Sequence, residues 1–219
     1  LELPNVIGLA EVMNYPGVLA RDPTVLAKLA AARSRLVDGH APGLTGRDLC
    51  AYLSAGIRSD HECTALQEAR DKIRLGMRVL IREGSVAKNM AALLPAVVPS
   101  TATRFGIVSD DRYPTDLLAG GHMDGLMKKA VALGLSPIAA IQMVTINPAQ
   151  CYSLKDLGAV APGFRADLVI LEDLRNFRVR AVFKDGRLVA KDGALLVSLP
   201  AAPRAPRSSI NIGWDRIRG

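Results

Sequence analysis

Short apolar runs alternate with helix-like segments along the first two thirds of the chain. The apolar runs begin near positions 6, 36, 56, 77 and 104, and segments rich in Ala and Leu fill the gaps, at residues 24–35, 44–54, 64–75 and 85–94. This alternation of strand and helix is typical of a parallel α/β arrangement, whose strands are buried on both faces. The pattern therefore predicts about five β/α repeats.

Local signals mark where the predicted helices begin. Asp22 precedes a proline, Ser136 precedes another, and Thr45 and Ser85 stand where a helix N-cap belongs. Small polar side chains at that position bind the free N–H groups of the first turn. Further helices are predicted at residues 121–133 and 136–145. In residues 64–75 the apolar side chains fall mostly on one side and Glu68, Asp71 and Lys72 mostly on the other, which predicts a two-sided helix that ends at Gly76.

Four of the apolar runs are each followed directly by a side chain of a type that binds metals. These side chains are Glu11, His40, His61 and Asp110. Because the carboxyl ends of parallel strands lie on one face of a sheet or barrel, we expect these four side chains to converge. Convergent imidazole and carboxylate groups are what a catalytic cation needs. The pattern indicates part of a metallohydrolase built on a (β/α)8 barrel. An open dinucleotide-binding sheet would need a Gly-rich turn after its first strand, which is absent.

Each of these residues also has an ordinary explanation when taken alone. Glu11 could be a strand-end carboxylate facing solvent, His61 a surface imidazole between Asp60 and Glu62, and Asp110 a helix cap. Two further features strengthen the set. Glu83 is another strand-end carboxylate, and the Gly-rich loop before His122 would let that imidazole approach a substrate.

The pattern changes beyond residue 158. Short strands are predicted at residues 166–171, 177–183 and 187–190, with a hairpin turn over residues 184–187. We therefore expect three parts: the barrel portion at residues 1–155, part of a small β domain at 156–199, and a linker-like tail at 200–219.

Composition excludes several other classes of protein. The net charge is +7, but the tail from residue 201 supplies four Arg against one Asp, hence +3 of it, and the remaining +4 is scattered without interleaved aromatics. Nucleic acid is therefore not an expected partner. No apolar run reaches the roughly 20 residues of a membrane span, and no signal peptide is evident. The widely spaced Cys50, Cys63 and Cys151 suit reduced thiols in the cytoplasm.

Six stretches of the sequence resemble the adenine deaminase branch of the amidohydrolase superfamily, in order and across about residues 5–190. They are GLAEVMNYPGV at 8–18, DGHAPGL at 38–44, AGIRSDHE at 55–62, IREGS at 81–85, SDDR at 109–112 and GHMD at 121–124. The first and third are the most specific. Residues 145–149 and 158–169 match motifs shared across the wider superfamily.

The resemblance implies a distorted TIM barrel, here about its last five strands, followed by part of a small β-sandwich domain. It implies two divalent metals per site, manganese or iron, with zinc as an alternative. Glu11 would bridge the metals, His40 and His61 would be ligands, and Asp110 would bind metal and carry a proton. The implied reaction is the hydrolysis of adenine to hypoxanthine and ammonia in purine salvage, by a homo-oligomer. Glu83 would serve in catalysis and substrate binding, and the other implied substrate-binding residues are Arg82 and His122.

One family feature is missing from the chain. The first barrel strand of the family carries a His-x-His pair, and no such pair occurs here, while the sequence opens with Leu1 directly before a strand-like run. We therefore expect the chain to be the middle of a longer polypeptide that lacks its N-terminal segment, and to be inactive alone. Two alternatives stay open. One is a cyclic amide or imide hydrolase, which usually bridges its metals with lysine rather than a residue such as Glu11. The other is a truncated, non-catalytic barrel that only binds metal or a partner.

Overall fold

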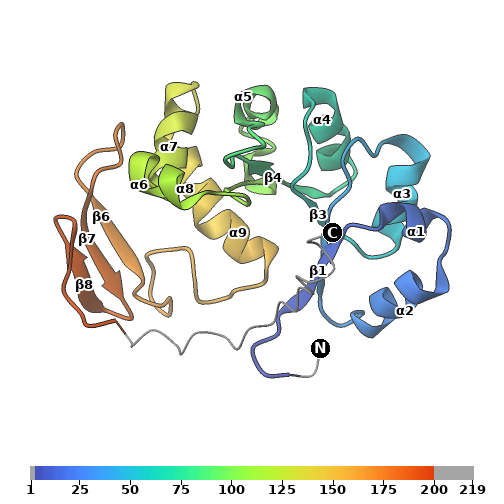
Figure 1. Cartoon of the computed structure of the whole chain (residues 1–219), viewed down its shortest axis with the longest axis horizontal. Coiled ribbons are helices and arrows are strands. Elements are labelled where there is room, and N and C mark those ends of the chain that lie inside the picture. Colours follow the sequence, from blue (N-terminus) through green and yellow to red (C-terminus); the bar gives the residue numbers. More distant parts are fainter. Residues whose placement is uncertain (1–2, 200–219) are drawn as a thin grey trace, which may run out of the picture.

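Five parallel strands form the centre of the chain in the computed structural model, which describes residues 3–199 (Figure 1). The first two pair with each other, and the other three form a second hydrogen-bonded group in the order β3-β4-β5. The N–H of Arg58 donates to the carbonyl of Val37 at 3.4 Å and links the two groups. The strands are β1 (Gly8–Val12), β2 (Leu36–Gly39), β3 (Ser59–Asp60), β4 (Arg78–Arg82) and β5 (Phe105–Val108).

Helices follow the strands in sequence, as the alternating pattern predicts. They are α1 (Tyr15–Leu19), α2 (Pro23–Ala31), α3 (Gly46–Ser54), α4 (Leu66–Arg74), α5 (Met90–Leu93), α6 (Pro114–Gly120), α7 (Met123–Ala132), α8 (Pro137–Val144) and α9 (Ile146–Cys151), with 3-10 turns at Leu94–Ala96 and Ala102–Arg104. The mixed α/β fold is thereby confirmed. Within residues 3–199 no helix is both long and apolar enough to cross a membrane.

Three of the four predicted helix starts are confirmed, at Asp22, Thr45 and Ser136, and two of these residues make the capping hydrogen bond. The Asp22 carboxylate accepts from the N–H groups of Thr24 and Val25, and the Ser136 hydroxyl accepts from that of Ala139. Thr45 stands at the N-cap of α3, but its side chain makes no capping hydrogen bond.

The predicted helix at residues 85–94 is wrong over its first half. Only Met90–Leu93 is helical before the 3-10 turn, and Ser85 caps nothing. Its hydroxyl donates to the Asp116 carboxylate and accepts from the N–H of Tyr113, so it ties the β4 loop to the loop before α6. These tertiary bonds replace the local capping bond that the sequence indicates.

The polar side of the helix at residues 64–75 is not a surface. In α4 the side chains of Glu68 and Lys72 are buried, with relative exposures of 5% and 0%. Only Asp71 of the three predicted polar residues remains partly exposed. The predicted helix is confirmed, but two of its polar residues are not exposed, because Lys72 and Glu68 pair with each other inside the protein.

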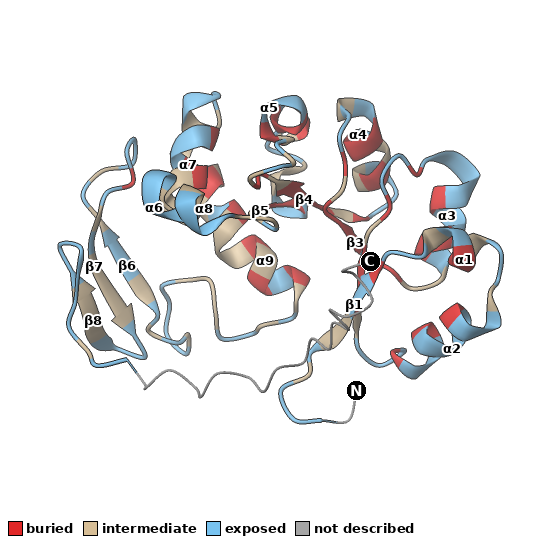
Figure 2. Cartoon of the chain, in the orientation of Figure 1, coloured by how far each residue is buried: buried red, intermediate tan, exposed pale blue. Residues whose placement is uncertain are grey.

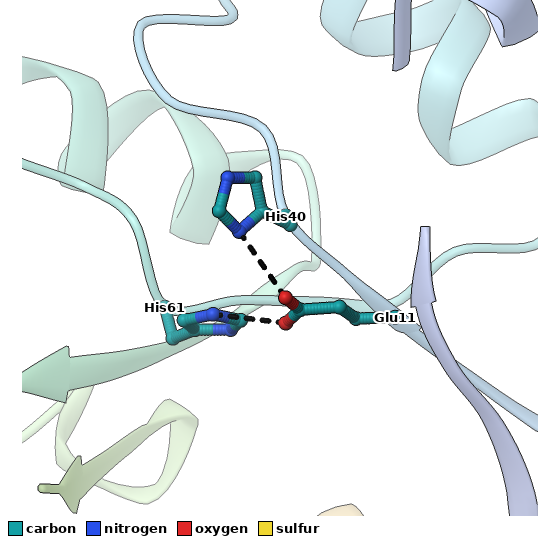
Figure 3. A group of neighbouring side chains, drawn as sticks. All are labelled: Glu11, His40 and His61. Carbon is teal, nitrogen blue, oxygen red and sulfur yellow. Dashed lines mark ion pairs between the residues drawn. The ribbon is translucent and has the colours of Figure 1, made fainter. Parts of the chain in front are cut away.

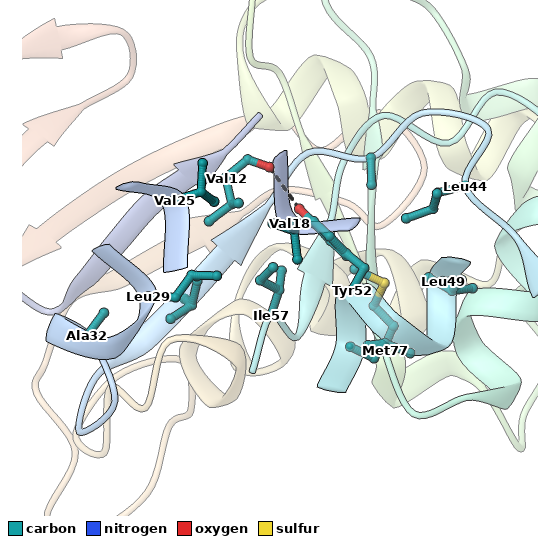
Figure 4. Close-up of a cluster of buried hydrophobic side chains, with 13 residues drawn as sticks. Val12, Val18, Val25, Leu29, Ala32, Leu44, Leu49, Tyr52, Ile57 and Met77 are labelled. Carbon is teal, nitrogen blue, oxygen red and sulfur yellow. Dashed lines mark hydrogen bonds between the residues drawn. The ribbon is translucent and has the colours of Figure 1, made fainter. Parts of the chain in front are cut away.

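Aliphatic side chains fill two main cores against the parallel strands. One lies between β1, β2 and helices α1 to α3, and Figure 4 shows its members gathered around Tyr52. The other lies between β4, β5 and the helices from α4 to α8. Figure 2 shows the buried residues concentrated on the strands and on the helix faces turned toward them. The parallel strands are thus held to the helices by packing.

A separate antiparallel sheet follows α9. Its strands, in the order β6-β7-β8-β9, are β6 (Leu168–Leu171), β7 (Val179–Lys184), β8 (Arg187–Lys191) and β9 (Ala194–Leu195). The predicted hairpin turn is confirmed: Lys184 pairs with Arg187 across Asp185 and Gly186, whose φ angles of 49° and 77° suit a tight turn. This sheet lies at the opposite end of the molecule from α2 and α3 (Figure 1).

The small sheet and the turn before β7 contact helices α7 and α8 through Phe177 and Leu171. Phe177, just before β7, is fully buried against Met127 of α7 and Ala140 of α8. The expected boundary at residue 155 falls in the connection between α9 and β6, and the division into domains stays a prediction. The linker-like tail expected at 200–219 lies outside the described residues.

Candidate metal centre

A bulge in β1 sets the position of Glu11. Leu9 pairs with Val37 whereas Val12 pairs with Gly39, so β1 has one more residue than β2 over this stretch. Such an extra residue breaks the regular alternation and re-aims a side chain. The Glu11 carboxylate faces the imidazoles that follow the next two strands.

Glu11 contacts both of those imidazoles, each through a different oxygen (Figure 3). Its Oε2 lies 3.0 Å from Nε2 of His61, and its Oε1 lies 3.5 Å from Nδ1 of His40. The two rings are 5.4 Å apart between centroids, with an interplanar angle of 75°. The arrangement is that of a carboxylate placed between two nitrogen ligands.

Contacts of the backbone hold the strand ends that carry the two histidines. The N–H of His40 donates to the Tyr52 hydroxyl at 3.0 Å, and that hydroxyl donates to the carbonyl of Val12 at 2.9 Å. Tyr52 therefore links the end of β2 to the end of β1. At Gly39 a Cβ would come within 2.2 Å of the carbonyl oxygen of Ser59, so glycine is required for β2 to approach β3 this closely.

A second group of ligand-type side chains shares His61. The ligand atoms of His61, Glu62 and Asp110 all lie within 4.8 Å of one another, as do those of Glu11, His40 and His61. The structure thus brings together all four of the residues expected to bind metal, and it adds Glu62. Sequence reasoning treated Glu62 only as a neighbour of His61. The signal was present, since Glu62 lies in a run of three ligand-type residues directly after a buried strand.

The residues present fit a divalent cation. Nδ1 of His40 is buried and has no hydrogen-bond partner among the described residues. A buried polar atom without a partner is costly, and coordination to a cation would satisfy it. Imidazole and carboxylate ligands suit zinc, manganese and iron alike.

Arg82 occupies the centre of a carboxylate group beside these ligands. Its guanidinium pairs with Glu62, with Asp110 at 2.7 Å and with Asp111 at 3.2 Å. Burial alone would lower the pKa of Arg82, but hydrogen bonding to Asp111 and the charges of Glu62 and Asp110 raise it. Three carboxylates therefore engage the group that was predicted to bind substrate, and Arg82 acts here as their common counter-charge.

Glu83 lines a cavity whose lining does not include Glu11, His40 or His61. It is buried, accepts from the N–H of Met90 at 3.0 Å and pairs with the ammonium of Lys129. With Lys88, Arg112 and other side chains it lines this cavity of about 340 Å³ beside α6 and α7. The structure does not bring Glu83 into contact with Glu11, His40 or His61.

His122 is exposed and stands at the N-terminus of α7. Its Nε2 lies 2.9 Å from the Ser109 hydroxyl, in the residue that precedes Asp110. The imidazole therefore lies at the same end of β5 as Asp110, the carboxylate that is expected to carry a proton. Its predicted role in substrate binding is untested and stays a prediction.

Histidine and carboxylate side chains at the carboxyl ends of parallel strands define the class of metal-dependent hydrolases. The model of the amidohydrolase family matches residues 2–189 of the chain. The chain belongs to the amidohydrolase family. Membership of this family implies a divalent metal.

Comparison with curated relatives shows which members of the family the chain is similar to. The chain is 51% identical over 212 residues to an adenine deaminase of Nitratidesulfovibrio vulgaris, which covers 95% of this chain and 37% of that protein. It is 48% identical over 220 residues to an adenine deaminase of Desulfatibacillum aliphaticivorans, covering 99% and 39% of the two chains. The resemblance to adenine deaminases that the motifs indicate is confirmed. The chain spans little more than a third of the length of these relatives.

Solved structures agree on the fold. A β-aspartyl dipeptidase of Fervidobacterium islandicum aligns with a TM-score of 0.68 at 16% identity, covering 92% of this chain and 60% of that one. An N-acetyl-D-glucosamine-6-phosphate deacetylase of Mycobacterium smegmatis aligns with a TM-score of 0.59 at 23% identity, covering 80% and 52%. At such identities the likeness concerns the fold alone.

Proposed function

We propose that this chain is part of a longer enzyme that hydrolyses adenine to hypoxanthine and ammonia. The observation that carries the proposal is the Glu11 carboxylate placed between His40 and His61 at the ends of three parallel strands. Support comes from identities of 48–51% to two adenine deaminases along nearly the whole chain. The chain covers 37% and 39% of the length of those relatives, which supports its being part of a longer polypeptide.

Glu11, His40, His61 and Asp110 would hold two divalent cations, and the chemistry that such cations supply is a water nucleophile of lowered pKa at neutral pH. Glu11 would contribute one negative charge shared between them. The two imidazoles present Nδ1 and Nε2 toward that carboxylate, and each would be neutral when it binds a cation. Glu62 would complete the group, because its Oε1 lies 3.6 Å from Nε2 of His61 and 3.9 Å from Nδ1 of His40, the same two nitrogens that face Glu11.

Asp110 is suited to moving the proton of the attacking water. Its Oδ2 is held by Arg82 at 2.7 Å, and its side chain remains 43% exposed. One oxygen is thus fixed while the other is open toward a substrate. Asp110 would accept the proton as the water attacks C6 of the purine, and pass it to the departing exocyclic nitrogen.

His122 and Glu83 would contact the purine from the β5 and β4 sides. The His122 imidazole can donate to or accept from a ring nitrogen, because the Ser109 hydroxyl beside it adapts to either tautomer. Glu83 would bind the purine from the cavity that it lines, and the Lys129 ammonium would balance the charge of its carboxylate. We assign Arg82 to the orientation of Asp110 and Glu62 in preference to direct contact with the base.

The finer features of the assignment are also proposals. The five parallel strands would belong to a (β/α)8 barrel, and the antiparallel sheet to a small β-sandwich domain. Manganese or iron is the preferred metal, with zinc as the alternative. We place the enzyme in the cytoplasm, as a homo-oligomer acting on a small purine in salvage. The free thiols of Cys50, Cys63 and Cys151 suit that compartment.

An assay of the full-length enzyme that contains this chain tests the proposal. Adenine should be converted to hypoxanthine with one ammonia released per turnover, chelation should abolish the activity, and Mn²⁺ should restore it. Dihydrouracil and hydantoin serve as cyclic amide and imide competitors. Ring opening of either without turnover of adenine would assign the enzyme to the cyclic amidohydrolases. Tight Mn²⁺ binding with no turnover of any of the three would indicate a non-catalytic barrel.

A further inference from the structure

Lys72 is fully buried and uses its entire hydrogen-bonding capacity. Its Nζ donates to the carbonyl of Ala41 at 2.7 Å, to Glu68 at 2.7 Å and to Asp60 at 3.1 Å. An ammonium has three donors, so none is left over. A lysine is almost never fully buried unless it is paired in this way.

The two carboxylates extend this network to the backbone of both histidine loops. Asp60 accepts from the N–H of Ala41 at 2.7 Å and from that of Glu62 at 3.1 Å. Glu68 accepts from the N–H of Gly43 at 2.8 Å. Ala41 directly follows His40, and Asp60 and Glu62 flank His61. One ammonium therefore joins the two loops that carry the imidazole ligands.

The network supplies its own cation. Ligand-type atoms of Asp60, Cys63 and Glu68 lie within 4.8 Å of one another, as at a metal site. However, Lys72 is bonded to both carboxylates and balances one of their two charges. Burial alone would lower the pKa of Lys72, but the charge of Asp60, with Cys63 and Glu68, raises it. The Lys72 ammonium therefore occupies the place of a cation between Asp60 and Glu68.

We propose that Lys72 is a positioning residue of the metal centre. Already in the metal-free protein, it holds the loops of His40 and His61 at the separation that metal binding requires. The inference rests on the proposed function only in taking Glu11, His40 and His61 as metal ligands. A ligand set that is ordered in advance avoids the cost of ordering it during binding. Loss of the link should therefore weaken metal binding more than it weakens the fold.

Two variants of the full-length enzyme separate these effects. Lys72→Met keeps the length of the side chain but raises the net charge of the network from −1 to −2. Lys72→Met combined with Glu68→Gln returns the net charge to −1 without restoring the ammonium that joins the loops. A matched control is Phe177→Leu, a buried position that packs on α7 and α8 away from both loops. Mn²⁺ binding is measured by calorimetry and the stability of the metal-free enzyme by thermal melting.

We expect the double variant to melt closer to the native enzyme than Lys72→Met does, while its Mn²⁺ affinity stays at least tenfold below native. Phe177→Leu should melt lower and bind Mn²⁺ normally. A folded double variant that binds Mn²⁺ within twofold of native would overturn the proposal. Mn²⁺ binding is read without adenine, so an enzyme that shows the expected affinities but no deamination contradicts the proposed function alone.

If neither variant folds, hydrogen exchange in the native enzyme tests the proposal. The N–H groups of Ala41 and Glu62 both donate to Asp60, and hydrogen exchange reports on them directly. Slow exchange of both amides in the metal-free enzyme supports a link formed before metal binding. Fast exchange that becomes slow only after Mn²⁺ is added would show that the metal orders the loops, and the proposal would be wrong.

Discussion

At the scale of single residues, the candidate site places carboxylates against imidazole and guanidinium groups. Glu11 contacts two imidazoles, and Arg82 contacts three carboxylates within the same group of strand ends. Two cations placed here would repel each other strongly, and a shared carboxylate offsets part of that repulsion. The charge of Glu11 should therefore matter more than its shape.

Replacing Glu11 by Gln in the full-length enzyme tests that expectation. The amide keeps the shape but removes the negative charge. Metal content should fall from two ions per site toward one, and adenine turnover should fall by at least about a hundredfold, the low end of what loss of a key electrostatic group costs. Metal analysis and steady-state kinetics measure both. The same change at exposed Glu172 is the control and should leave both quantities unchanged.

Sequence reasoning predicted the convergence of Glu11, His40, His61 and Asp110 because the carboxyl ends of parallel strands share one face. It failed at Glu68 and Lys72 for a physical reason. Periodicity separates polar from apolar residues, so an ion pair that neutralises itself inside the protein looks the same as an exposed polar face. Only the contacts of Lys72 with both loops distinguish the two.

At the scale of elements, the longer helices follow their sequence signals and the short ones do not. α2 and α8 begin at side chains that cap them. The five-residue α1 and the six-residue α9 were not predicted. Helices this short are unstable alone, so tertiary packing decides whether they form. The same argument explains why the segment after Ser85 is not helical until Met90.

The two caps with different contacts provide a matched pair. Ser136→Ala should lower the free energy of unfolding by about 1 kcal/mol, because the hydroxyl binds the N–H of Ala139. Thr45→Ala should change it far less, because the Thr45 side chain makes no capping bond. Chemical denaturation of both variants checks the difference. Equal losses would mean that the capping bond of Ser136 contributes nothing.

The hairpin between β7 and β8 should show a defined dependence on pH. Asp167 accepts from the ammonium of Lys184 at 2.6 Å and from the N–H of Asp185 at 2.9 Å, and these bonds hold the pKa of Asp167 below its ordinary 3.8. Because the folded pKa is lowered, this stabilisation is present above pH 3.8 and is lost as the pH falls through the folded value. Asp167→Asn should therefore melt lower than native at pH 6. The two melting temperatures should approach each other below pH 3, and a constant difference would contradict the assignment.

At the scale of the whole molecule, five parallel strands carry the candidate ligands, and a small antiparallel sheet packs on helices α7 and α8 through Phe177 and Leu171. The chain spans 37% of the length of the Nitratidesulfovibrio vulgaris relative. The family and the mixed α/β fold could be predicted from short motifs, because those motifs occupy the strand ends where the chemistry lies. The closure of a barrel depends on strand partners beyond the pairings seen here, so local pattern could not establish it.

The central claim is that Glu11, His40 and His61 hold a catalytic cation. Anomalous diffraction from crystals of the full-length enzyme grown with Mn²⁺ tests it most directly. The account predicts a manganese peak about 2.0–2.2 Å from a Glu11 oxygen, Nδ1 of His40 and Nε2 of His61, with a second peak about 3.5–4 Å away toward Asp110. Manganese bound elsewhere, for example among Asp60, Cys63 and Glu68 in place of the Lys72 ammonium, would contradict it.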